Sequence, residues 1–108
     1  MLSDDLTLRE KIIEVLKNTG TPLTVDDIIA LLGLRQSDRR LVYDAILHAA
    51  KSLSRKSHGR LEIVMVPPYC MKCGYVFKDL KKPRKPSKCP RCKSERIAPP
   101  RFIIREKT

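Results

Sequence analysis

Residues 67–77, Pro-Pro-Tyr-Cys-Met-Lys-Cys-Gly-Tyr-Val-Phe, and residues 88–100, Lys-Cys-Pro-Arg-Cys-Lys-Ser-Glu-Arg-Ile-Ala-Pro-Pro, contain all four cysteines of this 108-residue chain. Each stretch has one Cys-x-x-Cys pair, and fifteen residues separate the two pairs. One tight turn of this kind directs two thiolates at the same ion, and two such turns complete the tetrahedron of a structural zinc site. The spacing therefore predicts one metal ion, zinc by preference, held by Cys70, Cys73, Cys89 and Cys92.

Two cysteine pairs are also compatible with two disulfides, a redox-active dithiol or an iron site. Disulfides and redox dithiols require an oxidant or a partner fold that nothing else in the sequence indicates. Iron suits a four-thiolate tetrahedron as zinc does, so iron stays open as the metal. Four protein ligands leave no position for water, and the sequence has no nucleophile with its base and no phosphate-binding loop. We therefore expect neither an enzyme nor a small-molecule substrate.

Three apolar residues, Tyr75, Val76 and Phe77, follow the first cysteine pair closely. Aromatic rings beside cations are able to stack on nucleic-acid bases. A unit of about 30 residues, however, has little else with which to cover its metal. We therefore expect these residues to form a small core around the metal site.

The cysteine pairs lie between two short strands that proline pairs mark off. Residues 61–66, rich in β-branched and apolar side chains, predict one strand, and residues 101–105 predict the other. Pro67-Pro68 ends the first strand and Pro99-Pro100 precedes the second, and proline disfavours continuation of a helix or sheet. The pattern indicates a hairpin whose loop is replaced by a small metal-binding unit, residues 67–100, called the cysteine module below.

Upstream of these strands, the sequence predicts three helices. Thr7-Leu-Arg-Glu10 and Thr24-Val-Asp-Asp27 are capping boxes that begin the first and second helices. Ser37 or Asp38 is expected to cap a third helix, whose apolar stripe continues at helical spacing to about Leu53. Three helices followed by two strands predict an α+β chain.

Charge is distributed unevenly along the chain, whose formal net charge is +11. Residues 1–57 hold nine Lys/Arg and eight Asp/Glu, whereas residues 58–108 hold fourteen and four. Residues 78–93 alone hold eight Lys/Arg against one acid, Asp79. Two or three cations suffice to offset the dianion of four thiolates on a divalent ion, and the others predict a surface for a polyanion.

The sequence argues against a membrane protein. No apolar run is long enough to cross a bilayer, and residues 1–8 carry Asp4 and Asp5 without a basic residue, unlike a secretory signal. We therefore expect a cytoplasmic protein that makes no membrane contact. Asn18 and Gln36 are the only side-chain amides, and their scarcity beside abundant charge favours a thermophilic source.

The order of the elements and the amino-acid sequences of the motifs resemble those of a known family. Cys-Met-Lys-Cys-Gly-Tyr-Val-Phe-Lys, then Cys-Pro-Arg-Cys-Lys-Ser-Glu, then Pro-Arg-Phe closely resemble the archaeal family of small predicted transcriptional regulators in which a winged helix carries a rubredoxin-like zinc ribbon. The resemblance covers nearly the whole chain and implies an archaeal source. It implies a three-helix winged helix-turn-helix over residues 1–66, completed by a wing strand in residues 101–108. The zinc ribbon, residues 67–100, would then be inserted between the two wing strands.

The resemblance also implies DNA-related work. In a helix-turn-helix, the recognition helix enters the major groove with its N-terminal residues near the base edges. Arg and Gln side chains suit the edges of guanine and adenine respectively. The candidate contacts on and before the third helix are Arg35, Gln36, Arg39, Arg40, Tyr43 and Lys51. The candidate phosphate contacts in the cysteine module are Lys81, Lys82, Arg84 and Lys85.

Three functional hypotheses follow from the sequence. The first is a DNA-binding transcriptional regulator that binds double-stranded DNA and keeps zinc as a structural ion. The second is an adaptor of the transcription or replication machinery that docks on a protein partner, because residues 1–57 are almost neutral and the ribbon occupies the tip of the wing. The third is an iron-containing electron carrier.

Overall fold

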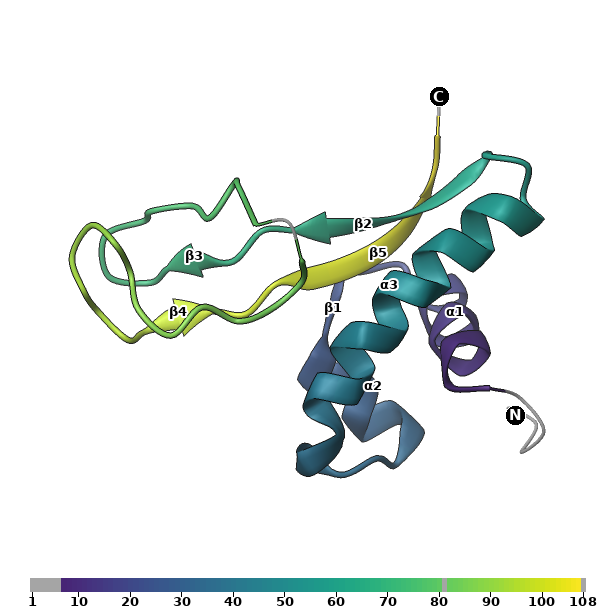
Figure 1. The fold of residues 1–108 in the computed structure, drawn as a ribbon, viewed down its shortest axis with the longest axis horizontal. Coiled ribbons are helices and arrows are strands. Elements are labelled where there is room, and N and C mark those ends of the chain that lie inside the picture. Colours follow the sequence, from purple (N-terminus) through teal and green to yellow (C-terminus); the bar gives the residue numbers. More distant parts are fainter. Residues whose placement is uncertain (1–6, 81, 108) are drawn as a thin grey trace.

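The computed structural model describes residues 7–80 and 82–107, in which helices pack on one face of a small sheet and the cysteine module extends from that sheet as an arm (Figure 1). The helical elements are α1 (Leu8–Asn18), α2 (Val25–Leu32), the 3-10 turn η1 (Gln36–Asp38) and α3 (Arg39–Lys56). The strands are β1 (Leu23–Thr24), β2 (Leu61–Val66), β3 (Tyr69–Cys70), β4 (Ile97–Ala98) and β5 (Arg101–Glu106). These elements confirm the α+β class. Within the described residues, no helix is both long and apolar enough to span a membrane.

Both predicted capping boxes are present. At the start of α1, the Glu10 N–H donates to Thr7 Oγ1 (3.3 Å), and the Thr7 N–H donates to Glu10 Oε1 (3.2 Å). At the start of α2, Asp27 and Thr24 make the same reciprocal pair at 3.1 and 3.0 Å. Each box satisfies two backbone donors that the first turn of a helix leaves without partners, so the local sequence alone places both helix starts.

The start of α3 differs from the prediction. Asp38 is the residue before the helix, but its side chain caps no α3 amide. Its carboxylate instead accepts from the backbone N–H of Arg35 at 3.0 Å and closes the η1 turn. Because this 3-10 turn already begins the helical rotation, α3 needs no side-chain cap of its own. The helix also continues to Lys56, beyond the expected end near Leu53.

The main sheet has the order β1-β5-β2, with both neighbours antiparallel to β5. The β2–β5 register pairs Ile63 with Ile104 and Met65 with Phe102, so these four side chains share the face that meets the helices. The short strand β1 was not expected from the sequence. It forms because Leu23 pairs with Phe102 at the other edge of β5. A tertiary contact of this kind cannot be predicted from the sequence of a two-residue segment.

The main core lies between the three helices and this face of the sheet. Its fully or almost fully buried members come from every helix and from β5: Ile12, Leu16, Ile28, Val42, Ala49 and Phe102. The α3 residues among them follow the predicted apolar stripe. The opposite side of α3, with Arg40, Asp44 and Lys51, is exposed to solvent.

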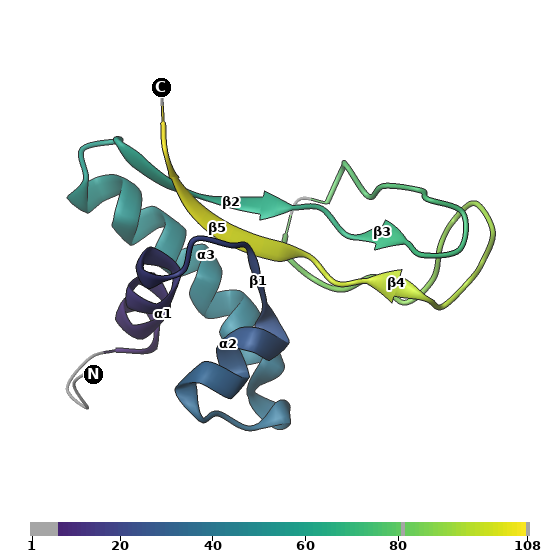
Figure 2. The ribbon, with the colours of Figure 1, turned by 180° about the vertical axis from the view of Figure 1, so that it is seen from behind.

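The cysteine module continues from the ends of β2 and β5 and contains a second sheet, in which β3 pairs with β4. Figures 1 and 2 both show the module extending beyond the ends of β2 and β5 along the strand direction, whereas α2 and the start of α3 project from one face of the main sheet. One loop of the module returns towards the main domain. Its residue Pro83 lines a cavity of about 180 Å³ together with residues of α3, β2 and β5, namely Ile46, Leu47, Ala50, Ile63, Met65 and Phe102. The module is thus in reach of α3 as well as of the sheet.

Candidate metal centre and neighbouring surfaces

The two cysteine turns have the same backbone construction. The Gly74 N–H donates to the Cys70 carbonyl (2.9 Å), and the Lys93 N–H donates to the Cys89 carbonyl (2.8 Å). Both Gly74 and Lys93 adopt left-handed backbone conformations, with φ of 82° and 63°. Glycine adopts this conformation at little cost, and Lys93 adopts it in spite of its side chain. The sequence therefore folds into two matching turns that carry one cysteine pair each.

The four cysteine sulfurs gather at one place. Their Sγ atoms all lie within 4.8 Å of one another, and all four cysteines are free thiols. The Cys70–Cys92 and Cys73–Cys89 sulfur separations are 3.5 and 3.6 Å, far longer than the roughly 2.05 Å of a disulfide bond. A tetrahedral zinc ion with Zn–S bonds of about 2.3 Å requires sulfurs roughly 3.8 Å apart. The donor set and its spacing therefore fit one four-thiolate metal ion.

Backbone donors stabilise negative charge on the buried sulfurs. The Cys73 N–H points at Cys70 Sγ (3.5 Å), and the N–H groups of Arg91 and Cys92 point at Cys89 Sγ (3.3 and 3.4 Å). The Cys73 N–H, against the opposing effect of burial, lowers the pKa of Cys70 to about 6. Burial acts to raise the pKa of Cys89, but the Cys92 and Arg91 amides lower it overall. Both buried thiols therefore lose their protons more readily than ordinary cysteines, which favours binding of a cation.

Cys92 behaves in the opposite way. A backbone hydrogen bond from Ser94 acts to lower its pKa, but burial and the other three cysteines raise that pKa to about 11. The four sulfurs compete for protons because their negative charges repel one another. A bound cation removes that repulsion, so metal binding and deprotonation of Cys92 are coupled.

The aromatic cover of the site agrees only in part with the sequence prediction. Tyr75 and Phe77 pack against the cluster of Cys70, Cys89 and Ile97, with their rings edge to face at 5.1 Å between centroids. Val76, expected in the same core, is 38% exposed because it lies on the other face of the extended segment. Tyr69 is the exposed aromatic of the module, and sequence reasoning missed it. Successive side chains of a strand point to opposite faces, so the inward position of the metal ligand Cys70 could have indicated that Tyr69 points outward.

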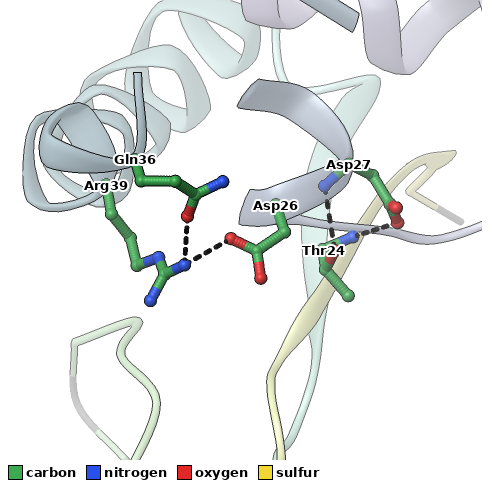
Figure 3. A network of polar contacts seen from close by, with 5 residues as sticks. All are labelled: Thr24, Asp26, Asp27, Gln36 and Arg39. Atoms are coloured by element: carbon green, nitrogen blue, oxygen red, sulfur yellow. Dashed lines mark hydrogen bonds and ion pairs between the residues drawn. The ribbon is translucent and has the colours of Figure 1, made fainter. Parts of the chain in front are cut away.

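The residues predicted to contact DNA before and at the start of α3 are brought together, but two of them are engaged. Arg35, Gln36, Arg39 and Arg40 are all exposed. Arg39 forms an ion pair with Asp26 of α2 (2.8 Å) and a hydrogen bond with the Gln36 side chain, as Figure 3 shows. Arg39 thus ties the start of α3 to the start of α2, whereas Arg35 and Arg40 face solvent.

The other two candidates on α3 have different surroundings. Tyr43 is half-buried and meets Phe102 edge-on at 6.5 Å between ring centroids. Burial, opposed by Arg39, raises the pKa of Tyr43, so it stays a neutral side chain packed at the border of the core. Lys51 is exposed three turns after Arg40, on the same side of the helix. Arg40 and Lys51 therefore mark a solvent-facing stripe along α3.

The basic loop, residues 78–88, supplies the remaining candidates. Lys82, Arg84 and Lys85 are exposed, and Lys81 lies outside the described residues. Pro83 stands between them and shares its cavity with Leu47 and Ala50 of α3. The loop cations are consequently held near the outward side of α3, a juxtaposition that no spacing in the sequence indicates.

Fold and sulfur cluster together define a small α+β protein whose four-cysteine metal site follows its helices. The chain belongs to the PF0610-like family: the model of the PF0610-like N-terminal domain matches residues 7–61, and that of the PF0610 rubredoxin-like zinc β-ribbon domain matches residues 67–107. Among solved structures it is similar to the solution NMR structure of protein PF0610 from Pyrococcus furiosus, with 28% sequence identity and a TM-score of 0.69 over 99% of this chain and 96% of that chain. No curated protein matches the chain. The cysteine module is thus a zinc ribbon.

Proposed function

We propose that this protein is a DNA-binding transcriptional regulator built as a winged helix-turn-helix. In this proposal α2, the turn through η1 and α3 form the helix-turn-helix, and β2 and β5 are the wing strands. Residues 1–66 and 101–108 make up the DNA-reading domain, and the zinc ribbon, residues 67–100, replaces the tip of the wing. Zinc is structural, because four thiolates leave it no open coordination position.

One observation carries the proposal: Pro83 lines one pocket together with Leu47 and Ala50, so the basic loop lies beside the outward side of α3. Cations from the two parts then belong to one surface, made of Arg35, Arg40, Lys51, Lys82, Arg84 and Lys85. A surface of this charge fits the phosphates that flank a major groove. The almost neutral charge of residues 1–57 is compensated by the loop, which takes over the phosphate contacts of an ordinary wing.

Different residues have different tasks on this surface. Arg35 and Arg40 lie at the start of α3, where a recognition helix meets base edges and phosphates. Arg39 has a supporting task, because its ion pair with Asp26 links the start of α3 to the start of α2. Tyr43 supports α3 through Phe102. Lys82, Arg84 and Lys85 supply contacts that depend on salt but not on sequence.

The test is a fluorescence-anisotropy titration of random and genomic duplex fragments with zinc-loaded protein at two salt concentrations. Arg40→Glu is expected to weaken binding about tenfold or more. Lys17→Glu makes the same charge change on α1, beside the cleft between α1 and the end of α3, and is expected to change affinity little. Equal effects of the two variants, or no salt-dependent duplex binding, would contradict the proposal.

A protein-docking role is the second candidate, and a specific observation favours it: Asp44 is exposed on α3 between Arg40 and Lys51. An acid in the middle of a groove-reading face repels phosphates and suits a partner with mixed charges. A protein that is recovered in pull-downs after nuclease treatment, and lost with Arg40→Glu, would support this role instead. Metal analysis of the same preparation tests the electron-carrier alternative, which requires iron at the four thiolates.

A further inference from the structure

The zinc ribbon has an outward sheet face that the metal site does not use. Along β3, Cys70 points inward to the cluster, so its neighbours Tyr69 and Met71 lie on the other face. Tyr69 is paired with Val76 on one side and with Ala98 on the other. Ala98 is small, so the Tyr69 ring has no bulky neighbour on that side.

This face is apolar and open. Met71 is 57% exposed, Tyr69 41% and Val76 38%, and these are three of the five large hydrophobic residues that the described chain exposes. The cross-strand pairing of Tyr69 with Val76 makes those two side chains direct neighbours. The three residues, called the Tyr69 face below, therefore form one patch instead of scattered single side chains.

Cations border the Tyr69 face. Lys72 follows Met71 in the chain, Lys78 follows Val76 by two residues, and Arg96 accepts a hydrogen bond from the Met71 N–H through its carbonyl (2.8 Å). All three cations are exposed. Residues 67–100 hold ten Lys/Arg and two Asp/Glu, so the module stays strongly positive even after the −2 charge of a tetrathiolate zinc site. The positive charge around the Tyr69 face therefore favours a polyanionic ligand.

We propose that the Tyr69 face binds single-stranded DNA. One base stacks on the Tyr69 ring, Met71 and Val76 contact the adjacent base or sugar, and Lys72, Lys78 and Arg96 bind phosphates. An exposed aromatic ring on a sheet, bordered by cations, is the arrangement with which proteins hold unpaired bases, whose faces are accessible only when they are out of a duplex. An acidic peptide is the weaker candidate, because it has no need of an aromatic platform.

The inference goes beyond the proposed duplex recognition and uses different residues. Only the choice of DNA over RNA rests on the proposed function. Duplex contacts belong to α3 and the basic loop, whereas stacking belongs to β3 and its neighbours. The two activities are therefore expected to respond to different substitutions.

The experiment titrates a fluorescein-labelled oligo-dT of about 20 nucleotides with zinc-loaded full-length protein at two salt concentrations. Tyr69→Leu, which keeps an apolar side chain but removes the ring, is expected to weaken binding about 5- to 150-fold. Tyr69→Phe keeps the ring and is expected to bind like the native protein. Leu41→Ser, at a position 57% exposed on α3, controls for loss of exposed apolar area elsewhere. Zinc content is measured for every variant, so that a misfolded ribbon is recognised.

The outcomes separate the two proposals. Tyr69→Leu should leave duplex affinity unchanged, and Arg40→Glu should leave oligo-dT affinity unchanged. Native affinity of the zinc-replete Tyr69→Leu variant for oligo-dT would overturn the inference, since charge alone would then explain binding. Absence of oligo-dT binding at low salt, equal binding of a poly-glutamate peptide, or tenfold tighter binding of oligo-U would overturn it as well, whatever the duplex result.

Discussion

At the scale of single residues, Gly74 and Lys93 offer a matched pair, because both hold the same left-handed position in equivalent turns. A Cβ added at Gly74 meets no atom within 4 Å, so the cost of Gly74→Ala is one of backbone conformation and not of space. We expect Gly74→Ala to cost about 1–2 kcal/mol. Folding of the ribbon is coupled to metal binding, so zinc affinity should fall roughly 5- to 30-fold.

Lys93→Gly is the complementary change. It removes the same conformational cost, offset in part by the greater freedom of glycine in the unfolded chain. Zinc affinity is therefore expected to rise by less than tenfold, roughly 1 kcal/mol at most. Competition with a chromogenic chelator measures both variants. An affinity that rises with Gly74→Ala, or falls with Lys93→Gly, would contradict the equivalence of the two turns.

The thiol pKa values predict how zinc binding depends on pH. The folded pKa of Cys70, about 6, lies below its ordinary value of 9.0, so its ionised form stabilises the folded ribbon above pH 9 and this contribution is lost as pH falls through 6. Without the metal the ribbon is unfolded, so its four thiols return to their ordinary pKa of 9.0 and keep their protons at pH 7. Zinc binding at pH 7 is therefore expected to release close to one proton per cysteine.

Calorimetry in buffers of different ionisation enthalpy counts these protons. The number should fall as pH rises through 9.0, the ordinary thiol pKa, because the free thiols then ionise before binding, and zinc affinity should rise in the same direction. Release of clearly fewer than four protons at pH 7 would show that the metal-free turns already hold the Cys70 thiolate, and would contradict unfolding of the ribbon on metal loss.

At the scale of elements, the α2 capping box gives the clearest prediction. Thr24→Ala removes the side-chain acceptor of the Asp27 N–H and is expected to destabilise the protein by about 1 kcal/mol. Thr21→Ala, at an exposed threonine in the preceding turn, is the matched control and should change stability little. Denaturant unfolding followed by helical circular dichroism measures both. Equal losses of unfolding free energy in the two variants would mean that the capping hydrogen bond of Thr24 contributes no stability of its own.

Elements whose causes are local could be predicted from the sequence, and those with distant causes could not. The boxes at Thr7 and Thr24 and the strands bounded by proline pairs are confirmed because each is specified by a few adjacent residues. Strand β1 was missed because it exists only through pairing with β5. The cap predicted at Ser37 or Asp38 was wrong for Asp38, because its carboxylate accepts a hydrogen bond from the backbone N–H of Arg35 instead of from an α3 amide.

The same distinction holds within the site. The four metal ligands follow from spacing, since two tight turns bring their own cysteines together. The engagement of Arg39 by Asp26 and the return of Pro83 to α3 depend on packing between segments far apart in the chain. Sequence therefore predicts which residues are available for a ligand, whereas tertiary structure decides which of them share a surface.

At the scale of the whole molecule, the main core and the metal cluster are two separate centres of stability. The buried residues of α1, α2, α3 and β5 form one cluster, and Cys70, Cys89 and Ile97 form another. Each centre has its own source of stability, apolar burial in the first and metal coordination in the second. Loss of the metal should therefore unfold only part of the chain.

Zinc removal tests this division. Chelation at neutral pH, or Cys89→Ser, is expected to abolish native amide shifts over residues 69–98 and to leave helical circular dichroism almost unchanged, because all three helices lie outside the module. Ser87→Ala, at an exposed serine of the basic loop, should retain zinc and native shifts.

If the protein binds duplex DNA as proposed, zinc loss should also reduce the salt dependence of binding by about 2 to 3 units of slope. That is the contribution expected when Lys82, Arg84 and Lys85 are no longer held beside α3. Cooperative loss of the helices with the metal would instead show that the packing of Pro83 on α3 joins the two centres into one unit.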